Sequence, residues 1–317
     1  MSDLTPNSSP SVRPFTSEEP AVTVPVFRPP TGAEDETALF FQPADGIPPS
    51  DPPTRIPHLG HALLFLAIAG GLLLISQLLL LAFAHPISTS TKTTFSPKFL
   101  VGSEALSYLA TLAISWLVFP LLWKRPFAEG IQLNFDATRR NAFRLIPMGL
   151  ILSFAVQAIS SLTTLPKNIP IDDFFRTQSD VWLVTAFGIL LAPLFEEVLF
   201  RGFLIPAFAI AYDWLSLPRT PGAHELWRST NKLTTPALVF SAVLTSILFA
   251  ALHGQQTGFA WPVLSLLFCV SLVLSFVRLR LRSVMASTLI HVSYNTTIFL
   301  TAFIATGGYR HLDKLGH

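Results

Sequence analysis

The sequence predicts an all-α fold, a polytopic transmembrane helical bundle of about seven spans that follows a disordered N-terminal tail. Three observations predict it. Half of the 317 residues are hydrophobic and only 13% are charged, whereas a soluble domain has about 25% charged residues. Seven apolar runs can each form about 17–25 helical residues, enough to cross a hydrocarbon core of about 30 Å. Residues 1–57 contain half of the 26 prolines and lack helical periodicity.

The N-terminal segment, residues 1–57, mixes proline with Ser, Thr, Asp and Glu. Such a composition cannot bury enough apolar surface to offset the entropy lost on ordering. We therefore expect a disordered tail, with docking of a partner as the alternative role. The first apolar run begins near Ala62, so we expect it to act as an uncleaved anchor rather than as a signal peptide.

The seven apolar runs divide the remaining chain into three parts. Residues 58–163 contain the first three spans, residues 164–306 the last four, and residues 307–317 form a C-terminal tail. The runs lie near 62–84, 99–122, 142–163, 181–212, 236–256, 259–277 and 283–306. The fourth run is longer than a span requires and contains Pro193, so we expect a kink that frees a backbone carbonyl about one turn earlier.

The charges in the loops predict an orientation. Basic residues gather after the second, fourth and sixth runs, at Lys124, Arg125, Arg139, Arg140, Arg219, Arg228, Lys232, Arg278, Arg280 and Arg282. The positive-inside rule then places the N-terminus in the cytoplasm, and we expect a multi-pass protein of the plasma membrane. The stretch 125–141 mixes apolar and basic residues; it either lies along the inner interface or forms a plain loop.

Charge argues against nucleic-acid binding, and cysteine content against disulfides and cysteine-based metal sites. The net charge of +2 is too small to indicate nucleic acid as a partner. The single cysteine, Cys269, lies in an apolar run, which excludes an internal disulfide and a cysteine-based metal site.

Two adjacent acids, Glu196 and Glu197, interrupt the apolar run 190–205. An ionised carboxylate at bilayer depth costs several kcal/mol, so such residues mark functional sites. Glu197 and Arg201 are four residues apart and share a helix face, which predicts a structural ion pair. Glu196 is rotated by about 100° from Glu197. It can therefore face a different cavity, remain unpaired and act as a general base or acid.

Two further polar pairs recur at helical spacing on later spans. His253 follows Phe249 by one turn, and Asn295 follows His291 by one turn. Taken separately, His253 is typical of an interfacial histidine, and the pair of His291 and Asn295 is typical of hydrogen bonding between helices. Taken with the acids, they predict a polar cavity shared by three spans. In a plain seven-span model, however, His253 lies near the outer end of its helix and His291 roughly 12 Å from the inner end. Some helices must therefore tilt, break or shift.

These side chains suit peptide hydrolysis in two forms. In one, Glu196 activates water while His291 and Asn295 stabilise the oxyanion. In the other, His253, His291 and a carboxylate, Glu196, bind Zn²⁺ and the second carboxylate acts as base. The sequence has neither a His-Glu-x-x-His run nor a Gly-x-Ser-x-Gly elbow. Both forms therefore remain open.

Three motifs, Glu196-Glu197-x-x-x-Arg201, Phe249-x-x-x-His253 and His291-x-x-x-Asn295, occur in this order over about 181–306. Together they resemble the motifs of the CPBP family, the CAAX protease and bacteriocin-processing (Abi) group. The resemblance implies an intramembrane endopeptidase that cleaves a membrane protein or peptide within the lipid bilayer. It implies that the catalytic residues are Glu196, Glu197, His253, His291 and Asn295, with Arg201 structural. Metal-dependent and metal-free glutamate mechanisms have both been argued for the family, so Zn²⁺ is the one candidate cofactor.

Two other functions compete with a protease. A non-catalytic immunity or interaction protein could keep the same scaffold, but the presence of every motif residue disfavours it. A proton-coupled transporter would also keep buried acids, but the sequence has no paired half-structure of broken helices, which disfavours it.

Overall fold

The computed structural model describes residues 55–83, 87–88, 93–94, 96–162 and 177–315. Nearly all of the predicted N-terminal tail, most of the loop near 164–180 and the last two residues of the C-terminal tail lie outside this part of the chain.

The part of the chain that the structure describes is helical apart from one hairpin of two-residue strands. Strand β1 (Ile87–Ser88) pairs antiparallel with β2 (Thr93–Thr94). Seven helical runs in the described residues are long and apolar enough to cross a membrane, which confirms the all-α class and the predicted number of spans. Six of them are α1 (Leu59–Phe83), α2 (Pro97–Trp123), α4 (Phe135–Ser160), α9 (Thr235–Leu252), α10 (Trp261–Leu281) and α11 (Val284–Ala305). The shorter helices are α3 (Phe127–Gly130), α8 (Pro221–Ser229) and the 3₁₀ turn η5 (Leu312–Leu315).

The fourth span, Gln178–Ser216, is a helical run of 39 residues. Its five parts are α5 (Gln178–Ala186), the π-helical η3 (Phe187–Leu191), α6 (Ala192–Glu197), the π-helical η4 (Val198–Leu204) and α7 (Ile205–Ser216). Pro193 is the second residue after η3 and has no N–H to donate, yet the helix continues through it. Segments of π-helix occur mainly at functional sites, and these two flank the acid pair.

The stretch 125–141 is not a plain loop. It contains α3, a short connection and the first turns of α4, which begins earlier than the apolar pattern indicates. The cause is local: the side chain of Asn134 accepts a hydrogen bond from the N–H of Ala137 at 2.9 Å. An N-cap of this kind stabilises a helix start even where the following residues are polar.

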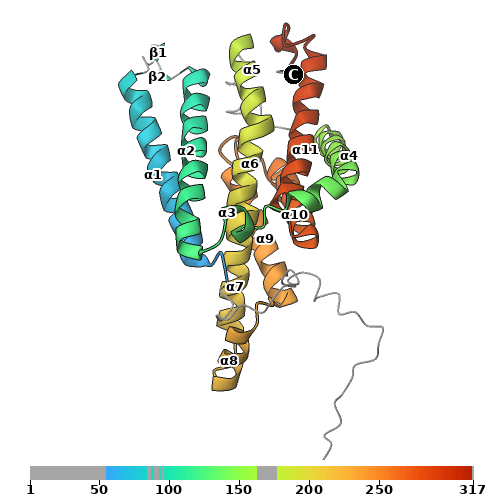
Figure 1. Cartoon of the computed structure of the whole chain (residues 1–317). Coiled ribbons are helices and arrows are strands. Elements are labelled where there is room, and N and C mark those ends of the chain that lie inside the picture. Colours follow the sequence, from blue (N-terminus) through green and yellow to red (C-terminus); the bar gives the residue numbers. More distant parts are fainter. Residues whose placement is uncertain (1–54, 84–86, 89–92, 95, 163–176, 316–317) are drawn as a thin grey trace, which may run out of the picture. The chain divides into compact units, whose positions relative to one another are not determined.

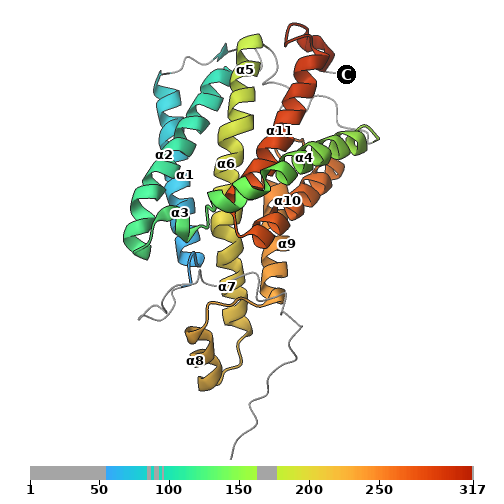
Figure 2. The ribbon, with the colours of Figure 1, turned by 45° about the vertical axis from the view of Figure 1, so that its right-hand side comes forward.

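The packing of the spans explains how distant residues meet. Helix α1 packs on α2, α4 and α10 pack on α11, and α9 packs between α7 and α10. Figure 2 shows α4 and α10 running obliquely across the bundle. Because α9 packs along α7, at the far end of the long fourth span, its C-terminal end comes level with Glu196. This shift resolves the mismatch in depth between His253 and His291.

Two packing features position α11 and the fourth span. A Cβ at Gly149 would lie 2.6 Å from the carbonyl oxygen of Ile290 and 2.6 Å from Cβ of Ser293, so α4 approaches α11 closely around His291. On the other side, an aromatic cluster packs α1 and α2 against η4. Its members include Phe65, Phe119, Trp123, Phe127 and Phe203. Many large apolar side chains of the spans stay exposed, as lipid-facing residues do.

Candidate active site

The acid helix α6 lies between α2 and α11 (Figure 1). It ends in Glu196 and Glu197, whose environments differ. Glu197 is fully buried, and its Oε1 accepts a hydrogen bond from Nη1 of Arg201 at 2.9 Å. The other terminal nitrogen of Arg201 donates to the carbonyl and hydroxyl oxygens of Ser271 on α10, at 2.9 and 2.8 Å. The ion pair therefore ties η4 to α10.

The same oxygen of Glu197 orients His291. Nδ1 of His291 lies 3.0 Å from Oε1 of Glu197, and since a carboxylate only accepts hydrogen bonds, this ring nitrogen carries the hydrogen. Nε2 of His291 then points to the other acid and lies 3.8 Å from Oε2 of Glu196.

His253 is fixed in a similar way from α9. Its Nδ1 lies 2.8 Å from the carbonyl oxygen of Phe249, which also accepts only, so Nδ1 again carries the hydrogen. The ring of Phe249 lies 4.6 Å from that of His253 and 6.0 Å from that of His291, and it packs beside both. Nε2 of His253 lies 4.0 Å from Oε1 of Glu196.

Glu196 thus lies between two imidazoles, and its side chain is 19% exposed. With both rings neutral, three hydrogen-bond acceptors face one small space. Gaps of 3.8 and 4.0 Å are too long for direct hydrogen bonds. A molecule that can donate hydrogens to these acceptors and present a lone pair, such as water, suits this space chemically.

The donor types also suit a metal ion. Two imidazole nitrogens and a carboxylate form a common zinc-binding set, and the pairing of His291 with Glu197 is the outer support that zinc-binding histidines usually have. Within the described ranges, however, no group of three or more His, Cys, Asp or Glu side chains is arranged to hold a metal ion. Glu196, His253 and His291 would bind such an ion after a small adjustment, and it would supply a Lewis acid.

Asn295 lies one turn after His291, but its amide nitrogen donates to the carbonyl of Gly188 at 2.6 Å. The N–H of Ala192 bonds to the carbonyl of Phe187, five residues back. The next N–H in this pattern would come from residue 193 and reach Gly188, but Pro193 has none. Asn295 therefore supplies the hydrogen bond that Pro193 cannot, and one of its two amide hydrogens remains for another partner.

A third acid, Glu104 on α2, lies near the site and is absent from the sequence prediction. The hydroxyl of Tyr108 donates to Glu104 at 2.8 Å, and the ring of Tyr108 stacks on Phe195 with centroids 3.8 Å apart. Both residues interact electrostatically with Glu196. Glu104 carries the same signal as Glu196, an acid inside an apolar run, but without a neighbouring motif.

Part of the chain is similar in sequence to known proteins. Residues 178–297 match the family model described as type II CAAX prenyl endopeptidase Rce1-like. The chain is 29% identical over 158 residues to an Escherichia coli protein described as "Uncharacterized 24.3 kDa protein". That alignment covers 49% of this chain and 58% of the relative, so the chain spans less than two thirds of the relative's length. No solved structure matches the chain. Over residues 178–297, this integral membrane protein is therefore similar to the Rce1-like, type II CAAX prenyl endopeptidase family, consistent with the CPBP group.

Proposed function

We propose that the protein is an intramembrane endopeptidase of the CAAX type in which Glu196 activates a water molecule. The observation that carries the proposal is the position of the Glu196 carboxylate between Nε2 of His253 and Nε2 of His291, at 4.0 and 3.8 Å. Each ring is held through its other nitrogen, so the three groups are preorganised around one reacting molecule.

In the proposed reaction, the water oxygen adds to the carbonyl carbon of the substrate while one of its hydrogens passes to Glu196. The same proton then reaches the departing amine nitrogen, and the C–N bond breaks to give a carboxylic acid and an amine. The free amide hydrogen of Asn295 is the proposed donor to the oxyanion. His291 can donate from Nε2 only when both of its ring nitrogens carry hydrogen.

Glu197 acts as a positioning residue in this proposal. It is fully buried and shares one oxygen between Arg201 and His291, which makes it a poor base for water. In the metal-assisted form, Glu196 would be a ligand and Glu197 would have to be the base. The burial of Glu197 therefore favours the form in which Glu196 itself takes the proton.

The proposed substrate is a membrane-anchored protein or peptide with its scissile bond near the bilayer surface. Basic residues lie in the loops and helix ends that follow the second, fourth and sixth spans, which supports a cytoplasmic N-terminus. The plasma membrane is the membrane that we propose.

Cleavage of a panel of lipidated peptides by the detergent-purified protein tests the proposal. We expect wild type and Glu225→Gln, which changes an exposed acid on α8, to cleave, and Glu196→Gln to lose at least about 10²-fold in rate. Activity that survives a chelator selects the metal-free form, whereas loss that Zn²⁺ reverses selects the metal-assisted form. Equal rates for Glu196→Gln and wild type, or no cleavage of any peptide, would contradict the proposal.

A further inference from the structure

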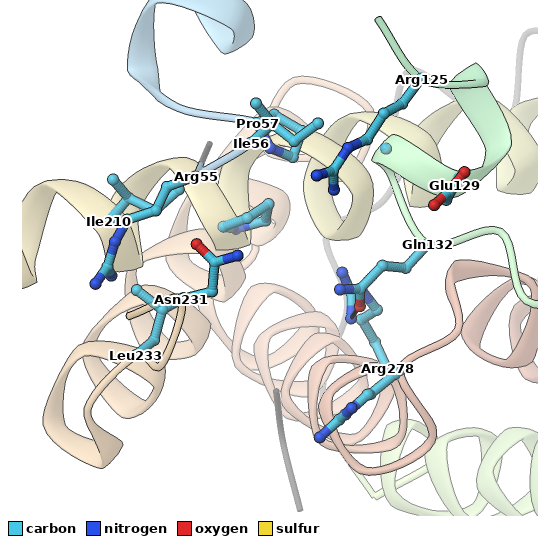
Figure 3. Close-up of a pocket in the computed structure, with 13 residues that line it drawn as sticks. Arg55, Ile56, Pro57, Arg125, Glu129, Gln132, Ile210, Asn231, Leu233 and Arg278 are labelled. Atoms are coloured by element: carbon cyan, nitrogen blue, oxygen red, sulfur yellow. Dashed lines mark hydrogen bonds between the residues drawn. The ribbon is translucent and has the colours of Figure 1, made fainter. Parts of the chain in front are cut away.

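A second polar site lies at the basic end of the spans, where a cavity of about 190 Å³ opens. It is lined from the segment before α1, the loop after α2 with α3, the first half of α7, the loop before α9, and the end of α10. Figure 3 shows Arg55, Arg125 and Arg278 around it, with Glu129 and Asn231. Apart from α7, these segments are the ends of spans that a seven-span topology places on one side of the membrane.

The charge lining this cavity is strongly positive. Four guanidinium groups line it, from Arg55, Arg125, Arg278 and Arg282, against the single carboxylate of Glu129 among the described lining residues. Burial lowers the pKa of Arg55, and the charge of Asp213 opposes the shift. A nearby anion would therefore stabilise the charged form of Arg55.

Arg278 is the most informative of the four. Only 2% of it is exposed, yet within the described residues it donates hydrogen bonds to neutral acceptors, the carbonyl of Arg201 at 3.1 Å and Oε1 of Gln132 at 2.8 Å. No carboxylate of the described residues forms an ion pair with it. A buried cation without a counter-ion is costly, so the cavity that it lines suits an anionic ligand.

Two other side chains complete a recognition site. Arg125 is exposed and reaches toward the cavity from the loop after α2 (Figure 3). The buried side-chain oxygen of Asn231 has no hydrogen-bond partner among the residues that the structure describes. An amide beside several guanidinium groups suits a ligand with a hydroxyl group next to its anionic group. Arg55 already donates to the carbonyls of Trp227 and Thr230, so it contributes charge rather than direct contact.

We propose that this cavity binds a phosphate ester with a neighbouring hydroxyl, either the headgroup of an anionic phospholipid or a soluble sugar or glycerol phosphate. Guanidinium groups bind phosphate through charge-assisted and often paired hydrogen bonds. The site is separate from the acid pair, although Arg278 contacts the backbone of η4 through the carbonyl of Arg201.

The test measures binding by the full chain purified in a zwitterionic detergent. Two probes separate the two sources: phosphatidylglycerol in mixed micelles, with phosphatidylcholine as control, and soluble glycerol 3-phosphate. Binding is read by native mass spectrometry and by the rise in Tm. Binding of the lipid alone identifies a headgroup, and binding of both probes identifies a site for free phosphate esters.

The variants are Arg125→Gln, Asn231→Ala and the matched control Arg140→Gln, an exposed arginine on the same side but outside the cavity. We expect Arg125→Gln to weaken binding about tenfold, since a charge-assisted hydrogen bond is lost, and Asn231→Ala to weaken it less. Arg140→Gln should bind as wild type does. Equal weakening by Arg125→Gln and Arg140→Gln would show only general attraction to a basic surface, and would overturn the proposal, as would binding of neither probe.

Discussion

At the scale of single residues, two neighbouring glutamates have different environments. Glu197 is fully buried and bound by Arg201 and His291, whereas Glu196 stays partly exposed between two imidazole nitrogens. The helical period explains the split, because successive side chains point about 100° apart. The ion pair of Glu197 and Arg201 could be predicted from spacing alone. The approach of Glu104 could not, because it depends on how α2 packs.

Replacing Arg201 by methionine should destabilise the protein by about 3–5 kcal/mol, because a buried carboxylate loses its cation. Thermal unfolding in detergent measures the loss. The double variant Arg201→Met with Glu197→Gln should recover much of it, since the carboxylate is then neutral. A double variant no more stable than the single one would show that the ion pair is not the cause.

Replacing Asn295 by alanine leaves the carbonyl of Gly188 without its donor, and should cost about 1–3 kcal/mol of stability. Adding Pro193→Ala supplies a backbone N–H that can reach this carbonyl, so the double variant should regain Tm. If Asn295 is also the oxyanion donor, peptide cleavage stays lost in the double variant. Recovery of cleavage together with Tm would reduce Asn295 to a structural role.

At the scale of elements, apolar runs predict the spans well because insertion into lipid depends on each segment separately. The start of α4 and the two π-helical segments were not predictable in this way. The start of α4 depends on a single capping side chain, Asn134. The π-helical segments depend on hydrogen bonds from another helix. The cavity lined by Arg55, Arg125 and Arg278 likewise combines residues from segments that are far apart in the sequence.

The close contact between α4 and α11 gives a prediction at this scale. Gly149→Ala should destabilise the protein by about 1–3 kcal/mol, because the added methyl group meets backbone atoms that cannot move aside. It should also lower peptide cleavage, since the contact flanks His291. The matched control is Gly102→Ala on α2, where nothing lies within 4 Å of the new Cβ. Equal Tm values for the two variants would contradict this account.

At the scale of the whole molecule, the orientation in the membrane can be measured. In a Cys269→Ser background, we expect Ser229→Cys on α8 to react with a membrane-impermeant maleimide only after cells are permeabilised. Arg310→Cys, beyond the end of α11, should react in intact cells. Both positions are exposed in the structure, so a reversed pattern would mean that the positive-inside rule gives the wrong orientation.

The meeting of His253 and His291 at one acid is the part of the site that a list of spans does not predict. Equal, upright spans would place the two rings at different depths. The structure brings them level because α9 packs along α7 and α10 lies obliquely. The motif pattern indicates which side chains meet, and the unequal placement of the helices explains how.

The helix that carries both glutamates is about 58 Å long, roughly twice the thickness of the hydrocarbon core. One end of this helical run must therefore extend beyond the hydrocarbon core into water. A protein that binds this end would transmit force to Glu196 and Glu197 along a helical run that no loop interrupts. A partner outside the lipid would in this way change the position of the two acids inside it.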